Sequence, residues 1–134
     1  MNHRGTEAQS EDERDPLTHA VIGAAIEVHR ILGPGLLESV YQECLCYELG
    51  LRGIEAHPQV ALPIVYKELK VKDPFKMDLL IPNQLVIERK TVADFHPVHE
   101  AQLLTYLRLS GIRRGLLLNF NVALLKDGIR RMVL

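Results

Sequence analysis

No hydrophobic run in the sequence approaches the roughly 18 residues that a bilayer-spanning helix needs, so no membrane association is expected. The first 15 residues also lack the apolar stretch of a secretory signal, which makes the cytoplasm the expected location. Only two cysteines occur, Cys44 and Cys46. Their spacing points them to different sides of a predicted helix, where they cannot easily bond to each other or chelate one metal ion. We expect both to be reduced thiols with a structural role.

A strong net charge is missing as well. The formal charge is −1 at pH 7, which argues against a protein that coats nucleic acid by electrostatics alone. Residues 1–15 carry five acids and two bases, whereas the remaining 119 residues hold 14 bases and 12 acids. The total of 134 residues leaves room for one domain and one core. Because residues 1–14 are polar and show no periodicity, the sequence predicts a disordered tail there and a single domain over 15–134.

Three segments have the apolar spacing of helices. The first follows Asp15-Pro16, a capping side chain with proline at the first helical position, and it ends at Gly33-Pro34-Gly35. The second is predicted over about 36–49. The third runs from His96-Pro97 to Ser110-Gly111.

Five segments are predicted as strands. They are 60–65, 76–81, 85–91, 115–121 and 129–134. Pro63 marks the first of them as an edge strand or a bulge, and the polar segment 67–74 after it predicts a turn. The order is therefore α-α-β-β-β-α-β-β. An α/β fold with a mixed sheet flanked by helices is the natural way to bury its apolar faces.

Charged residues interrupt the apolar pattern of the hairpin predicted at 76–91. If the hairpin is symmetric about Asn83, Asp78 lies directly opposite Glu88, with β-carbons roughly 4.5–5.5 Å apart. Two carboxylates at that distance repel each other unless a proton or a cation such as Mg²⁺ lies between them. Lys90 projects from the same face, where an ammonium group could activate a metal-bound water. The alternative is a solvated strand face with a cross-strand ion pair.

Two helices add candidate residues. A period of 100° per residue places Glu38 inside the apolar arc of the second helix, where a carboxylate needs a partner. A metal ion is one candidate, and an acid reaching solvent at the edge of the arc is the other. On the third helix, His99, Gln102 and Tyr106 form a polar stripe. Such a stripe fits either hydrogen bonding at the edge of the core or chemistry.

Several separated motifs together resemble the GxxExxY protein family. The signature is matched by Gly35-Leu-Leu-Glu38-Ser-Val-Tyr41, and later segments by His99-Glu-Ala-Gln102-Leu-Leu-Thr-Tyr106-Leu and Gly115-Leu-Leu-Leu-Asn119-Phe120. The resemblance covers roughly residues 17–134. That family is placed in the PD-(D/E)XK nuclease superfamily. The resemblance therefore implies an α-β-β-β-α-β core, here with one extra helix before it and one extra strand after it.

The resemblance also implies catalytic roles. Glu38 would be the helical acid of the superfamily and Asp78 its aspartate. Glu88-Arg89-Lys90 would be the (D/E)-x-K element, and Gln102 the glutamine on the following helix. The chain departs from the family pattern at Met77, where proline is usual, and at Arg89, where an apolar residue is usual.

Metal and substrate ligands follow from the same resemblance. The implied ligands of Mg²⁺ or Mn²⁺ are Asp78, Glu88, the backbone carbonyl of Arg89, and Glu38. The implied substrate contacts are Tyr41, His99 and Tyr106.

The implied function is a metal-dependent nuclease that hydrolyses phosphodiester bonds. A fold of about 120 residues offers little surface for reading sequence, which favours structure- or end-dependent cleavage. DNA is favoured over RNA as the partner, and a homodimer is left open. The alternative is a non-catalytic module that binds nucleic acid or protein on the same fold, and a hydrolase of small phosphate esters is a third reading.

Overall fold

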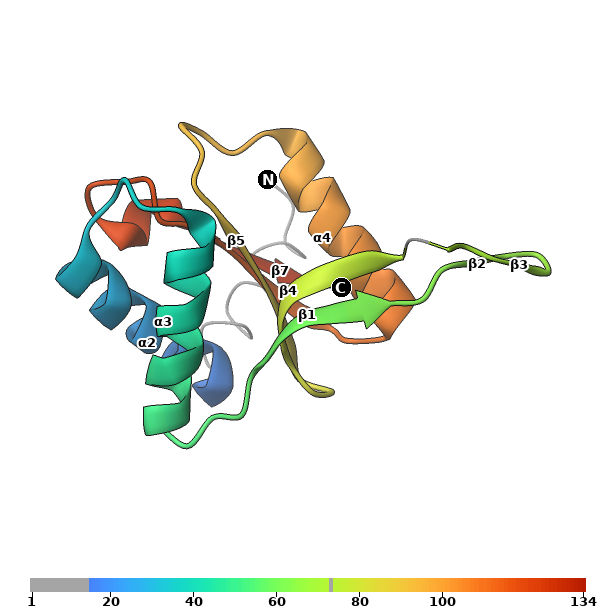
Figure 1. Ribbon diagram of the computed structural model, residues 1–134, viewed down its shortest axis with the longest axis horizontal. Coiled ribbons are helices and arrows are strands. Elements are labelled where there is room, and N and C mark those ends of the chain that lie inside the picture. Colours follow the sequence, from blue (N-terminus) through green and yellow to red (C-terminus); the bar gives the residue numbers. More distant parts are fainter. Residues whose placement is uncertain (1–14, 73) are drawn as a thin grey trace, which may run out of the picture.

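Five strands form one mixed sheet with helices on both faces (Figure 1). The protein is described by a computed structural model over residues 15–72 and 74–134, and the tail predicted at 1–14 lies outside these residues. The strands are β1 (His57–Leu62), β4 (Phe75–Ile81), β5 (Leu85–Lys90), β6 (Arg114–Asn119) and β7 (Ile129–Val133). Their order is β1-β4-β5-β6-β7, with β5 and β6 parallel and the other neighbours antiparallel. β1 is an edge strand, as expected, but it begins three residues before the predicted strand 60–65 and ends before Pro63.

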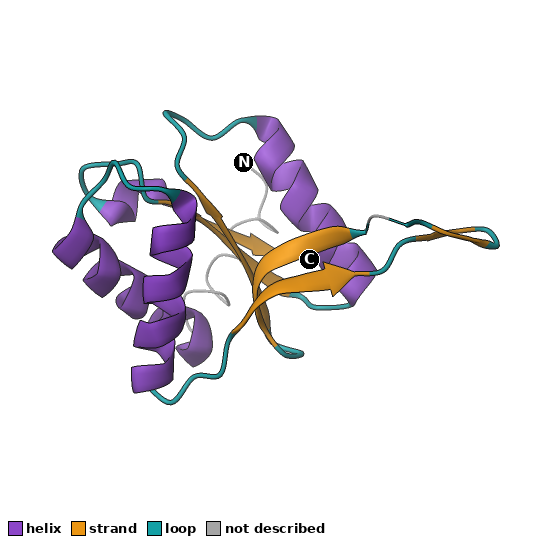
Figure 2. Cartoon of the chain, viewed as in Figure 1, coloured by secondary structure: helices purple, strands orange, loops and turns teal. Residues whose placement is uncertain are grey.

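Two helices, α2 (Pro16–Leu32) and α3 (Glu38–Leu51), cover one face of the sheet, and α4 (Pro97–Ser110) covers the other (Figure 2). α2 begins as expected, because the Asp15 carboxylate accepts a hydrogen bond from the N–H of Thr18 at 3.0 Å. α4 ends as expected at Gly111, whose left-handed φ of 76° glycine adopts without strain. The predicted α/β fold is confirmed.

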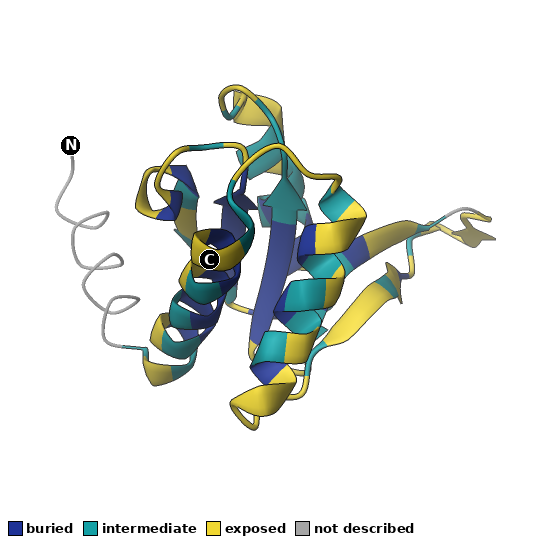
Figure 3. Ribbon diagram, turned by 60° about the vertical axis from the view of Figure 1, so that its left-hand side comes forward, coloured by how far each residue is buried: buried dark blue, intermediate teal, exposed yellow. Residues whose placement is uncertain are grey.

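The sheet separates two apolar clusters, and its central strands are buried between the helices (Figure 3). The larger cluster packs α2 and α3 against β4, β5 and β6, with Leu45 and Leu118 fully buried in it. The smaller cluster packs α4 against the opposite face around Leu103 and Leu107. Because both faces of β5 and β6 are covered, these strands are rich in apolar residues. The two cysteines on α3 are free, as expected.

The hairpin of β4 and β5 has the register that the sequence predicts. Leu79 pairs with Ile87, and Ile81 pairs with Leu85, so the hairpin is symmetric about Asn83. Asn83 has a positive φ of 63°, which asparagine tolerates better than most residues. The four apolar side chains are buried in the larger cluster, so one face of the hairpin packs against the core.

Two elements depart from the prediction. Within the segment 67–74, predicted as a turn, Lys67 and Glu68 do form a turn, but Leu69–Lys70 is a strand, β3, which pairs with β2 (Val65–Tyr66) in a second sheet of two strands. The side chains of β2 and β3 are exposed on both faces of this small sheet. The sequence therefore shows no alternation of buried and exposed residues that would predict these strands. A 3-10 helix, η1 (Leu125–Gly128), precedes β7. No helix within the described residues is long and apolar enough to cross a membrane.

Candidate active site

The sheet forks at Asp78 and Glu88. The pairing of β4 with β5 runs from the turn as far as Leu79 opposite Ile87. Beyond that pair, β4 continues beside β1 to its first residue, and β5 continues beside β6 to its last (Figure 1). The register therefore brings Asp78 and Glu88 opposite each other at the point where the two strand pairs separate.

Each acid at the fork accepts a hydrogen bond from the backbone of the opposite strand. The N–H of Asp78 donates to Oε2 of Glu88 at 2.8 Å, and the N–H of Arg89 donates to Oδ2 of Asp78 at 3.1 Å. Strand N–H groups in the interior need acceptors, and here carboxylates replace the carbonyls of a neighbouring strand. Because Glu88 is only 3% exposed, its carboxylate is held in a largely dry position.

The electrostatics of the fork favour a cation. Burial, and then the negative charge of Asp78, raise the pKa of Glu88 from its ordinary 4.5 to about 8. The N–H of Asp78 and the charges of Lys90 and Arg89 oppose that rise in the pKa. The carboxyl group therefore keeps its proton up to about pH 8, and a cation bound beside it would favour release of that proton.

Arg89 points to the other side of β5, toward α3. Its Nη1 lies 3.5 Å from Oε1 of Glu38 and 3.9 Å from Oδ2 of Asp78, and its side chain is 12% exposed. The guanidinium is therefore an internal cation between two acids, which explains why this position is not apolar. Its Nε is buried and has no hydrogen-bond partner among the described residues. Charge, rather than hydrogen-bond geometry, holds the group in place.

Glu38 does not join the pair at the fork. It is the first residue of α3, where the helix N-terminus favours a carboxylate, and its side chain is 43% exposed. It therefore does not lie inside an apolar arc, because no preceding helical turn covers it. Within residues 15–72 and 74–134, no group of three or more His, Cys, Asp or Glu side chains could hold a metal ion. Glu38 meets Arg89 instead of sharing an ion with the other two acids.

α4 brings Tyr106 and Gln102 close to the acids. Tyr106 is 3% exposed. Burial, and then the negative charges of Glu88 and Asp78, raise its pKa to about 12, and a hydrogen bond with Gln102 opposes the rise. The hydroxyl of Tyr106 is therefore protonated at neutral pH and shares one environment with the two acids.

Lys90 links the acids to His99 in the first turn of α4. Its positive charge acts on the pKa of both Glu88 and His99. Burial is the first cause of the lowered pKa of His99, followed by Lys90 and His96. Nδ1 of His99 accepts a hydrogen bond from the N–H of His96 at 3.1 Å, so Nε2 carries the proton in the neutral ring.

A model of the PD-(D/E)XK nuclease superfamily matches residues 15–132. The chain belongs to this superfamily. Membership indicates a nuclease-type function with nucleic acid as the substrate class, and PD-(D/E)XK nucleases generally use divalent metal ions. No curated protein and no solved structure matches the chain.

Tyr41 does not join the acids of the fork. Its side chain is completely buried, and its ring stacks on Phe120 with centroids 4.5 Å apart. Its hydroxyl donates to the carbonyl of Gly33 at 2.6 Å and accepts from the N–H of Leu36 at 3.2 Å. The prediction of a substrate contact is therefore corrected. Tyr41 fixes the loop before α3, and thereby the position of Glu38.

Two further polar residues lie beside residues of the fork and were not singled out as site residues from the sequence. Gln59 on β1 has a positive φ of 51°, and its amide donates to Gln42 on α3 at 2.9 Å and to Oδ1 of Asp78 at 3.4 Å. Asn119 is 2% exposed and exchanges two hydrogen bonds with the backbone of Val92. Asn119 could have been found from the sequence, because it is a polar residue at the end of an apolar strand. No sequence pattern distinguishes Gln59.

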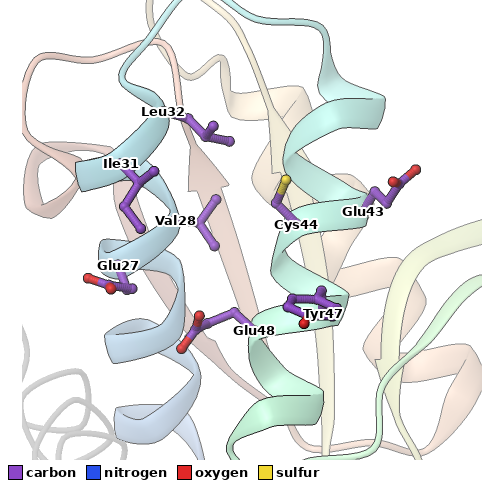
Figure 4. A pocket seen from close by; sticks show the side chains of 8 residues that line it. All are labelled: Glu27, Val28, Ile31, Leu32, Glu43, Cys44, Tyr47 and Glu48. Carbon is purple, nitrogen blue, oxygen red and sulfur yellow. The ribbon is translucent and has the colours of Figure 1, made fainter.

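A groove of about 370 Å³ between α2 and α3 is a poor place for a nuclease substrate (Figure 4). Its lining residues are Glu27, Val28, Ile31, Leu32, Glu43, Cys44, Tyr47 and Glu48. No base is among these described lining residues, and two of the three glutamates already pair with Arg30 and Arg52, so the groove offers no cation to the phosphates of nucleic acid. The fork is therefore the better candidate for the PD-(D/E)XK chemistry.

Proposed function

We propose that the chain is a divalent-metal-dependent nuclease that hydrolyses phosphodiester bonds at the fork of its sheet. The observation that carries this function is the carboxylate pair of Asp78 and Glu88, each held by a backbone N–H where β4 and β5 separate. The signature at 35–41 supports placement in the GxxExxY group of the superfamily. A small fold favours cleavage that depends on strand ends or on structure, with DNA favoured over RNA.

The donor atoms at the fork fit a hard divalent ion. Asp78 and Glu88 supply carboxylates and Arg89 a backbone carbonyl, the oxygen ligands that Mg²⁺ and Mn²⁺ prefer. Burial, and then the charge of Asp78, raise the pKa of Glu88 to about 8 despite the opposing charges of Lys90 and Arg89, so a further cation would favour its carboxylate. When bound, the ion would polarise a phosphate oxygen and lower the pKa of the attacking water.

Lys90 would orient the attacking water. Its ammonium group is a donor of three hydrogen bonds, and it lies near enough to Glu88 and His99 to act on the pKa of both. A hydrogen bond donated by Lys90 to the oxygen of that water would hold it beside the phosphorus, and the water would give up a proton to solvent as it attacks. Lys90 is therefore a catalytic residue in this mechanism.

Residues of α4 would position the substrate beside that water. Gln102, hydrogen-bonded to Tyr106, would orient the substrate or Lys90. The protonated hydroxyl of Tyr106 and Nε2–H of His99 are donors suited to phosphate oxygens.

Glu38 would act through Arg89 as a positioning residue. The guanidinium lies 3.5 Å from Glu38 and 3.9 Å from Asp78, so it neutralises part of the acidic charge beside the ion. This role replaces direct coordination by Glu38.

A non-catalytic binding module is the second candidate, and one observation favours it. Both acids at the fork already have protein partners, because backbone N–H groups bind them and Arg89 lies beside Asp78. Acids whose charge is already balanced by groups of the protein could be retained in a chain that has lost catalysis.

Cleavage assays separate these two functions. The assay compares wild type with two fork variants, Lys90→Met and Glu88→Gln, and with the control Lys126→Met, at an exposed lysine on η1. The substrates are single-stranded, duplex, flap and branched DNA, and RNA, with Mn²⁺ at low salt. We expect cleavage by wild type and by the control, and a loss of at least about 100-fold in the two fork variants. Undiminished cleavage in both fork variants would contradict catalysis at the fork. Binding without cleavage across the panel would favour the binding module.

A further inference from the structure

A two-stranded ribbon projects from the sheet beside the fork. Its strands, β2 and β3, pair through Val65 opposite Lys70 and Tyr66 opposite Leu69, and they connect β1 with β4. Lys67 has a positive φ of 54° in the tight turn between them. Figures 1 and 2 show the ribbon extending away from the body of the protein.

The ribbon exposes large apolar side chains that have no core to pack against. Val65, Tyr66 and Leu69 are 60%, 64% and 61% exposed. Within the described part of the chain, no residue of β2 or β3 belongs to either apolar cluster. A lone two-stranded hairpin is marginally stable, and a group of exposed apolar side chains usually marks a contact surface. The ribbon therefore has the properties of a surface that a partner completes.

Lysines give this part of the chain a positive charge. Residues 63–76 carry four lysines against one glutamate and one aspartate, whereas the rest of residues 16–134 holds ten bases and ten acids. The ammonium group of Lys67 lies 5.4 Å from the centre of the Tyr66 ring. Positive charge beside exposed aromatic and aliphatic groups suits a partner with both phosphates and apolar surfaces, which is nucleic acid.

The base of the ribbon leads into the fork. β4 begins at Phe75, three residues before Asp78, which is roughly 10 Å along a strand. The ring of Phe75 lies 5.5 Å from the ring of Tyr106, the α4 residue that lies close to the acids. A polymer that followed the ribbon toward the sheet would therefore reach Asp78.

We propose that the ribbon is a substrate-holding arm that enters the major groove of double-stranded DNA and leads one strand to the fork. This role rests on the proposed nuclease function and names its substrate. The major groove of B-form DNA is about 12 Å wide and admits a two-stranded ribbon, whereas that of A-form RNA is too deep and narrow. The lysines bind phosphates along the groove, and the exposed apolar side chains contact base edges.

Binding of DNA in EDTA tests the arm without cleavage. Fluorescence anisotropy with a labelled DNA duplex would compare wild type, the triple variant Lys67→Ala/Lys70→Ala/Lys72→Ala, and the control Lys126→Ala. We expect the triple variant to bind at least about tenfold more weakly, with a slope of log affinity against log salt that is shallower by about 2 to 3. The control should bind duplex DNA as wild type does. Unchanged circular dichroism of the variant would exclude a loss of folding.

The outcomes separate the arm from the nuclease. Equal binding by the triple variant and the control overturns the arm and leaves the nuclease function intact. Selective loss of duplex binding, with no cleavage of any nucleic acid by wild type and Mn²⁺, supports the arm and contradicts the nuclease. An equal loss of affinity for single strands or duplex RNA overturns the assignment to the major groove.

Self-association is the remaining competitor for this surface. Light scattering would compare wild type with Val65→Ser/Tyr66→Ser/Leu69→Ser. We expect the same mass for both proteins and weaker duplex binding by the variant. A wild-type dimer that becomes monomeric in the variant, with DNA affinity unchanged, overturns the proposal.

Discussion

The two halves of the β4–β5 hairpin differ in what their side chains do. Near the turn, Leu79, Ile81, Leu85 and Ile87 are buried, and the backbones pair directly with each other. One residue further from the turn, the carboxyl groups of Asp78 and Glu88 accept hydrogen bonds from backbone N–H groups. Beyond that point the two strands separate, and each continues beside a different neighbouring strand. One strand pair therefore contributes stability at one end and an acidic site at the other.

The comparison teaches that the two ends should respond to different changes. The turn half gains its free energy from apolar burial, which is insensitive to pH and to metal ions. The fork half contains a buried carboxyl group with a raised pKa and an internal cation, Arg89, and both depend on pH or added charge. Substitutions at the two ends can test this division.

The largest effect is expected in the turn half. Leu85 is completely buried, so Leu85→Ala should lower the free energy of unfolding by about 2–5 kcal/mol through lost burial and a cavity. Urea unfolding measures the loss. The shift should be the same at pH 6 and pH 8 to within about 0.5 kcal/mol, because no titrating group is removed. A loss below about 1 kcal/mol would contradict the contrast between the two halves.

The next effect is a pH dependence that comes from Glu88. Its pKa rises from 4.5 to about 8 on folding, so the folded state holds an extra proton between these values. The stabilisation is complete below about pH 4.5 and is lost as the pH rises to about 8, at a rate of at most about 1.4 kcal/mol per pH unit. Urea unfolding in EDTA between about pH 5.5 and about pH 8.5 measures the slope.

Glu88→Gln is the control for that slope, because glutamine does not titrate. The difference in unfolding free energy between wild type and Glu88→Gln should fall steadily as the pH rises. A difference that is flat across this range would mean that Glu88 has no raised pKa in the folded protein.

A smaller effect is expected from removing the internal cation. Arg89→Met leaves Glu38 and Asp78 without the guanidinium between them, and should cost about 1–3 kcal/mol without metal. The control Arg52→Met removes a more exposed arginine, paired with Glu48 on α3, and should cost less than about 1 kcal/mol. Saturating Mn²⁺ should restore more stability to Arg89→Met than to the control. Equal losses and equal recovery in the two variants would show that Arg89 does not neutralise the fork.

The hairpin was predictable because its signals are local. A turn centred on Asn83 and a period of two residues fix the register, and the register alone brings Asp78 opposite Glu88. The polar stripe on α4 was visible for the same reason, since helical spacing places Gln102 and Tyr106 on one side. Whether the stripe only forms hydrogen bonds at the edge of the core or takes part in chemistry depends on the residues of the neighbouring strand β5.

The rest of the site depends on tertiary contacts that no local pattern records. The partner of Arg89 follows from where α3 begins over the sheet, and the signature motif does not distinguish a buried Tyr41 from one that contacts substrate. Met77 and Leu79 are two residues apart, yet they join opposite apolar clusters, so simple alternation fails at the fork. Gln59, opposite this point on β1, has a positive φ that its residue type does not predict.

Calorimetric titration with Mn²⁺ tests the central claim, that the fork is a metal site, most directly. The comparison is between wild type, Glu88→Gln and the control Glu43→Gln, at an exposed acid of the α2–α3 groove. We expect wild type and the control to bind Mn²⁺ equally and to release a proton near pH 7, since Glu88 is protonated before the ion binds. Glu88→Gln should lose both the binding and the proton release. Identical titrations of wild type and Glu88→Gln, or no binding by wild type at any concentration, would contradict the account.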